Sequence, residues 1–176
     1  FGTMADFDAF VRRAHALGMK VLIDWVANHT SRDARWLAEC PADWYERDAS
    51  GRPVVPNGWD DTAKLDYTNR AVWQGQIDAM RFWLAEHGVD GFRCDMAMLL
   101  LPDVFERTWG HRVPLFWPTA IQRVREHAPG FLFMAEVYWD MEWTLQQQGF
   151  DYTYDKRLYD RLRNLQARPV REHFHA

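Results

Sequence analysis

The chain has 176 residues, of which 48% are hydrophobic and 26% charged, and its formal net charge is -4. Its 21 basic residues are scattered among 25 acidic ones, so it lacks the clustered positive charge that a nucleic-acid partner requires. No stretch approaches the roughly 18 apolar residues that span a bilayer, so we expect no nucleic-acid partner and no membrane-embedded segment.

The two cysteines, Cys40 and Cys94, lie far apart and match neither a metal-ligand pair nor a disulfide framework. Compartment and oligomeric state therefore stay open. Ten tryptophans is a high number for this length. Indole faces suit the apolar faces of sugar rings, although most of these side chains are expected to pack in the core.

Apolar residues at helical spacing predict a first helix over 4–17, with Thr3 as its N-cap and Gly18 as its stop. A strand is predicted over 19–26, because its apolar run lacks the alternation of a half-exposed strand. The periodicity then disappears among prolines and glycines. A loop of this length inside a compact domain is usually functional or a small subdomain, so we interpret 30–68 as an inserted segment.

Helical spacing resumes after Asn69, a candidate cap, and ends at Gly88. Further strands are predicted over 89–95, 131–138 and 150–154. The segment 96–118 is predicted to be irregular. Helices are predicted over 119–127, 143–148 and 156–167. Strands that alternate with helices predict an α/β fold with a parallel sheet, which periodicity alone does not assign to an open sheet or a barrel.

Polar side chains gather where three of these strands end, and in α/β sheets and barrels that edge forms active sites. Within the second strand the period of two places Arg93 and Asp95 on one face and Cys94 on the other. The candidate site residues are Asp24 near the end of the first strand with Asn28 and His29 beyond it, Arg93 and Asp95 on the second, and Glu136 on the third.

Two of these carboxyl groups have different expected environments. A neighbouring Arg93 favours the ionised form of Asp95, as a nucleophile requires. Glu136 follows the apolar run 131–135, and desolvation there favours a protonated acid. Such a pair matches the retaining mechanism of glycoside hydrolysis. Taken singly, an Arg-x-Asp pair is more often a structural ion pair, and Asn28-His29 a turn pair.

The joint pattern resembles the α-amylase family of glycoside hydrolases, glycoside hydrolase family 13. Residues 24–29 resemble its first signature region, 91–95 its second, and Glu136 with the preceding apolar strand its third. Residues 63–67 are weakly similar to an auxiliary motif after the third barrel strand. The matches extend from about residue 19 to residue 138.

The resemblance implies part of a (β/α)8 TIM barrel over 1–176, from about helix 2 to helix 6, with a short inserted loop subdomain after strand 3. It implies Asp95 as nucleophile, Glu136 as general acid/base, and Arg93 as the residue that orients and ionises the nucleophile. In the same way it implies His29 as a donor to sugar hydroxyls and Asp24 as a structural partner in the site.

Asn28 matches a position that ligates calcium in many members, which makes it a candidate Ca2+ ligand. In the family, calcium often depends on the inserted subdomain, which is short here. We therefore expect no cofactor to be required, and no further metal ligands are predicted.

The implied activity is retaining hydrolysis of α-glucosidic bonds in starch-like glucans or maltooligosaccharides, with such a glucan as the partner molecule. The alternatives are an α-glucan transglycosylase or trehalose-forming enzyme, and a non-catalytic sugar-binding relative. The family's third catalytic carboxylate has no counterpart before Ala176, and the early barrel strands are missing as well. We therefore expect a catalytic fragment that is inactive alone, because half a barrel leaves open strand edges.

Overall fold

A parallel sheet of four strands organises the computed structural model, which describes residues 2–175. The strand order is β1 (Leu22–Trp25), β4 (Gly91–Cys94), β5 (Leu132–Ala135) and β6 (Tyr152–Thr153), so each strand pairs with the next of the four along the chain. A helix lies between successive strands, as parallel connections require. The predicted α/β fold with a parallel sheet is confirmed.

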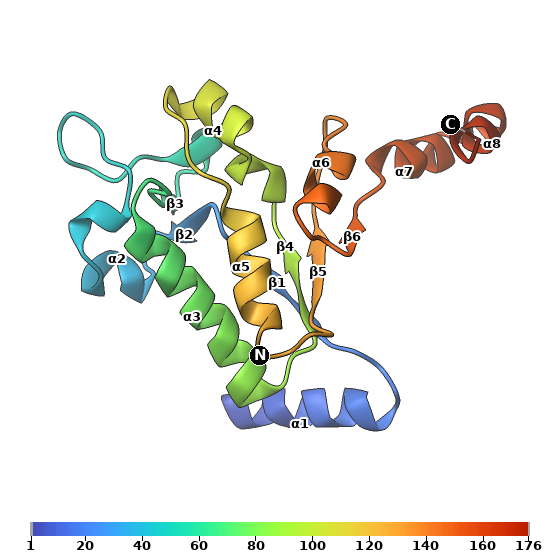
Figure 1. Cartoon of the computed structure of the whole chain (residues 1–176), viewed down its shortest axis with the longest axis horizontal. Coiled ribbons are helices and arrows are strands. Elements are labelled where there is room, and N and C mark those ends of the chain that lie inside the picture. Colours follow the sequence, from blue (N-terminus) through green and yellow to red (C-terminus); the bar gives the residue numbers. More distant parts are fainter. Residues whose placement is uncertain (1, 176) are drawn as a thin grey trace.

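The main helices of the sheet are α1 (Met4–Ala16), α3 (Arg70–His87) and α5 (Phe116–Arg125). Figure 1 shows α3 and α5 side by side over one face of the sheet, and the two helices contact each other. Beyond β5 follow α6 (Glu142–Gln147), α7 (Lys156–Arg163) and α8 (Ala167–His173), of which the last two extend away from the sheet (Figure 1).

Short elements fill the two long connections. The connection from β1 to α3 holds an antiparallel pair, β2 (His29–Ser31) and β3 (Thr62–Lys64). Between β2 and β3 lie α2 (Arg35–Glu39), η1 (Ala42–Trp44) and η2 (Pro56–Gly58), and after β4 come η3 (Ala97–Leu100) and α4 (Pro102–Trp109). Among the helices formed by residues 2–175, none has both the length and the apolar character that crossing a bilayer requires.

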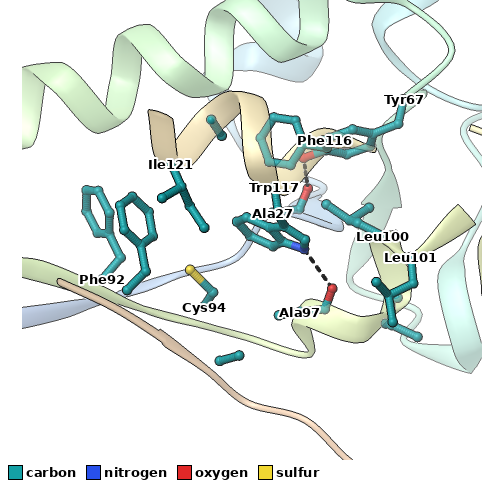
Figure 2. Close-up of a cluster of buried hydrophobic side chains, with 14 of the residues drawn as sticks. Ala27, Tyr67, Phe92, Cys94, Ala97, Leu100, Leu101, Phe116, Trp117 and Ile121 are labelled. Atoms are coloured by element: carbon teal, nitrogen blue, oxygen red, sulfur yellow. Dashed lines mark hydrogen bonds between the residues drawn. The ribbon is translucent and has the colours of Figure 1, made fainter. Parts of the chain in front are cut away.

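The core lies between the sheet and α3 and α5, and two aromatic side chains anchor loops to it (Figure 2). The indole of Trp117 is fully buried and donates to the carbonyl oxygen of Ala97 at 2.9 Å. Tyr67 is also fully buried and donates to the carbonyl oxygen of Ala27 at 2.7 Å. Because each polar tip meets a loop carbonyl, the segments after β1 and β4 are fixed to the core.

The structure differs from the predicted elements in three places. Helix α5 begins at Phe116 rather than near residue 119, with Pro118 in the first turn, where a missing N–H leaves no helical bond unmade. The segment 96–118, predicted to be irregular, contains α4, which Pro102 begins. The helix predicted over 156–167 ends at Arg163, and Leu165 (φ 55°) separates it from α8.

Gly91 lies between Leu22 of β1 and Leu132 of β5 and leaves no room for a side chain. A Cβ there would lie 2.5 Å from the carbonyl oxygen of Leu132 and 2.9 Å from the Leu22 side chain. We therefore expect Gly91→Ala to lower the free energy of unfolding in urea by about 1–3 kcal/mol, the usual cost of overpacking. Gly130→Ala is the matched control, because a Cβ at Gly130 meets nothing within 4 Å. Equal stability of the two variants would contradict this account of the sheet.

Candidate active site

Arg93 is the centre of the candidate site. It lies on β4, on the face opposite the buried Cys94, and its guanidinium contacts carboxylates from the ends of three different strands. Its Nη1 donates to Asp24 Oδ1 at 2.8 Å and to Asp95 Oδ1 at 2.9 Å, and its Nη2 lies 2.9 Å from Glu136 Oε2. The structure thus brings together four of the six candidate residues, at the carboxyl edge of the sheet where they were predicted.

The fourth strand also contributes. Tyr154, directly after β6, accepts a hydrogen bond from Arg93 Nε at 3.0 Å through its hydroxyl oxygen. Burial acts to lower the pKa of Arg93, but its bonds to Tyr154 and the carboxylates raise that pKa well above the ordinary value. The sequence analysis missed Tyr154. Its place at the end of the fourth predicted strand is the signal that could have found it.

Glu136 is buried and receives two further hydrogen bonds. Tyr138 donates its hydroxyl proton to Glu136 Oε1 at 2.6 Å, and the Met96 amide donates to Oε2 at 2.9 Å. Met96 has a φ of 41°, in the left-handed region that side-chain-bearing residues seldom adopt. Strained residues of this kind cluster at functional sites. Here the strained backbone aims its N–H at the carboxylate, a contact that no sequence signal indicated.

The electrostatics of the two carboxyl groups are the reverse of the sequence-based expectation. Burial acts to raise the pKa of Glu136, but the bonds from Tyr138, the Met96 amide and Arg93 outweigh burial and hold that pKa below its ordinary value. Burial and the nearby Glu136 raise the pKa of Asp95, and Arg93 offsets this incompletely. One guanidinium shared by three carboxylates stabilises each of them less than a dedicated partner would.

Asn28 and His29 follow β1 and form no hydrogen bond to this cluster among residues 2–175. Asn28 is 2% exposed, and its Nδ2 lies 3.3 Å from His29 Nδ1. The ring of His29 packs against Trp59, with centroids 5.1 Å apart. Burial and the charge of Lys64 lower the pKa of His29, which favours a neutral imidazole. His29 is therefore able to act as a hydrogen-bond donor or acceptor near the strand ends.

The surroundings of Asn28 do not fit calcium. Its Oδ1 is buried and has no hydrogen-bond partner among the described residues, which by itself suits a cation. Calcium, however, takes six to eight oxygen ligands. The carbonyl oxygens of Asn28 itself and of Leu65 already have a partner, because Lys64 Nζ lies 3.5 Å from the first and 3.0 Å from the second. Burial lowers the pKa of Lys64 to about 7, against the charges of Glu46 and Asp66.

One further group has the right chemistry for a metal ligand set. Atoms of Glu46, Asp66 and His111 lie within 4.8 Å of one another. His111 Nε2 is already 3.0 Å from Glu46 Oε1, and the ammonium of Lys64 acts on both carboxylates. The Lys64 side chain thus lies close to this group of potential ligands.

Comparison with known proteins agrees with the geometry. The family model described as "Alpha amylase, catalytic domain" matches residues 1–62 and 44–166. A probable α-glucosidase of Rhizobium meliloti is 36% identical over 127 residues, which cover 54% of this chain and 23% of that protein. An α-1,4-glucan:maltose-1-phosphate maltosyltransferase of Arcanobacterium haemolyticum is 31% identical over 162 residues, covering 87% of this chain and 21% of that protein.

Among solved structures, an α-amylase from Lactobacillus plantarum superposes with a TM-score of 0.72 at 37% identity, covering 91% of this chain and 38% of that one. The chain thus spans well under half the length of each of these relatives. Its parallel sheet and outer helices form an arc of the (β/α)8 barrel that the family resemblance implies. Because the family model matches most of this chain, the chain belongs to the α-amylase catalytic-domain family.

Proposed function

We propose that the protein is a retaining glycoside hydrolase that cleaves α-glucosidic bonds in starch-like glucans or maltooligosaccharides. The observation that carries the proposal is the binding of Asp95 and Glu136 to the two terminal nitrogens of one guanidinium. Two carboxyl groups held by one planar cation lie close together. Retaining enzymes require such closeness, with carboxyl groups about 5–5.5 Å apart.

In the proposed first step Glu136 donates a proton to the glycosidic oxygen while an Asp95 oxygen attacks the anomeric carbon. The bond from that carbon to the leaving oxygen breaks, and an ester to Asp95 forms. Water then attacks the same carbon and gives a proton to Glu136, and the ester bond breaks. Arg93 binds Oδ1 of Asp95, which orients the carboxylate for attack.

The chemistry requires a protonated Glu136 and an ionised Asp95. In the free site the surroundings favour the opposite distribution, since Glu136 has three donors and Asp95 has its bond to Arg93. We propose that the leaving oxygen of a bound sugar, placed against Glu136, favours the protonated form of that carboxyl, while Arg93 keeps its bond to Asp95.

The substrate class is supported by the relatives. Their names, an α-glucosidase, an α-amylase and a glucan maltosyltransferase, have α-linked glucose in common. His29 and Trp59, packed against each other beside the strand ends, offer a polar and an aromatic surface for a sugar ring.

A second candidate is glucan transglycosylation, which the 31% identity to the maltosyltransferase favours. The two reactions share the ester at Asp95 and differ only in whether water or a sugar hydroxyl attacks it. Accumulation of chain-lengthened oligosaccharides in excess acceptor identifies the transferase, and release of reducing sugar alone identifies the hydrolase.

Substitution of Glu136 separates its acid role from a binding role. In the full-length protein we expect Glu136→Gln to lower kcat on maltooligosaccharides at least about a thousandfold. The loss should be far smaller on an α-glycosyl fluoride, because fluoride leaves without a proton. Asp95→Asn should lose activity on both substrates, because the ester cannot form. Glu142→Gln, at the start of α6 and without a hydrogen bond to the Arg93 cluster among residues 2–175, is the matched control. Equal losses of Glu136→Gln on the two substrates would refute the acid role.

Tyr138 is a positioning residue for Glu136, and its hydroxyl lowers the pKa of that carboxyl. Glu136 must be protonated to donate, so activity falls as pH rises through its pKa. Removing the donor in Tyr138→Phe raises the pKa, and we expect the alkaline limb of kcat/KM to move to higher pH, with kcat lower by about tenfold. Tyr159→Phe, an exposed tyrosine on α7, should leave the profile unchanged. An unmoved alkaline limb in Tyr138→Phe would exclude this role.

A further inference from the structure

The side chain of Lys64 is enclosed entirely by the protein. It lies on β3 with 0% exposure, whereas lysine is rarely buried unless its charge is paired. Among residues 2–175 it forms no direct salt bridge. The structure must therefore compensate the loss of water around this ammonium in another way.

The compensation consists of carbonyl oxygens and aromatic faces. The ammonium donates to the Leu65 carbonyl at 3.0 Å and lies 3.5 Å from the Asn28 carbonyl. On its other side it lies 4.3 Å from the ring centroid of Phe105, with the rings of Tyr67 and Trp109 each at 5.6 Å. Aromatic faces attract cations most strongly where water is excluded, as it is here.

Charge around this cage is balanced at slightly longer range. Glu46 and Asp66 both act on Lys64. Glu46 also meets His111 Nε2 at 3.0 Å, while His111 Nδ1 lies 3.1 Å from the Trp109 carbonyl oxygen. The carboxylates of Glu46 and Asp66 therefore lie near one ammonium, that of Lys64, and one imidazole, that of His111. In this arrangement the ammonium supplies the positive charge that a bound cation would supply in a metal site.

The cage joins parts of the chain that are distant in sequence. Asn28 follows β1, Lys64 and Leu65 end the inserted segment (30–68), and Phe105 and Trp109 belong to α4 after β4. A divalent ion gathers distant carbonyl and carboxylate oxygens around one positive charge. Lys64 does this with a covalently attached charge.

We propose that the Lys64 ammonium is a built-in structural cation that takes the place of a divalent metal ion in joining the inserted segment to the barrel. This inference disagrees with the calcium site that the family resemblance implies at Asn28. It predicts that the stability of the inserted segment depends on Lys64 and not on a bound metal ion.

Thermal unfolding of the full-length protein at pH 6 tests the inference. We expect the same melting temperature in excess EDTA and in millimolar calcium. Lys64→Met should lower the melting temperature by at least about 5 °C, since it removes the side-chain donor to the Leu65 carbonyl and the positive charge near Glu46 and Asp66. Added calcium should not restore the loss. The matched control is Lys20→Met, which removes an exposed lysine and should leave the melting temperature unchanged.

The double variant Glu46→Gln/Lys64→Met tests the charge balance, because it removes one carboxylate together with its cation. We expect its melting temperature to lie above that of Lys64→Met. A wild-type melting temperature for Lys64→Met would overturn the inference. The inference would also be overturned if EDTA lowered the melting temperature of the wild-type protein but not that of Glu46→Gln. This second comparison needs no variant of Lys64.

Discussion

One guanidinium holds the candidate site together. Arg93 binds Asp24 on β1, Asp95 and Glu136 directly after β4 and β5, and the hydroxyl of Tyr154 after β6, so each strand of the sheet contributes a partner. A partly buried arginine needs such partners, because an unpaired charge removed from water is costly. Likewise, three converging carboxylates would repel one another without the cation. The burial of the Arg93 guanidinium therefore depends on the carboxylates, and the convergence of the carboxylates depends on the guanidinium.

Strand register makes this convergence possible. Asp24 pairs with Arg93 across β1 and β4, and Cys94 pairs with Ala135 across β4 and β5. The residues that follow, Asp95 and Glu136, are then neighbours at the same edge. A slip of one residue in β4 would turn Arg93 toward the helices and Cys94 toward the site. The absence of a side chain at Gly91, where a Cβ would clash with both neighbouring strands, is compatible with this register.

Much of the fold and the site can be predicted from sequence, because each depends on patterns local to a strand or helix. The convergence of Asp24, Arg93, Asp95 and Glu136 follows from the rule that parallel strands share a carboxyl edge. By contrast, the contacts of Tyr138, Tyr154 and the Met96 amide depend on loop conformation, including a left-handed residue that no propensity predicts. The expected protonation of Glu136 was wrong for this reason. An apolar strand before a carboxyl says nothing about the donors that loops bring to it.

Lys64 illustrates the same limit. A lysine in a segment without periodicity is expected to be solvated, but its burial depends on aromatic side chains some forty residues away in sequence, on α4. The starts of α4 and α5 differ from the predictions for another reason, because Pro102 and Pro118 lie in the first turns of these helices, where proline is tolerated. The burial of Lys64 depends on tertiary contacts, whereas these two helix starts follow a local rule.

The central claim is that Asp95, held by Arg93, forms the bond to the sugar. The most direct measurement is peptide mass spectrometry of the full-length protein after reaction with a fluorinated α-glycosyl fluoride, which forms the ester faster than water cleaves it. The account predicts a stoichiometric mass increase on the peptide that contains Asp95, and its loss when an acceptor sugar is added. A label on Glu136, or an unlabelled protein whose product has the inverted anomeric configuration, would contradict it.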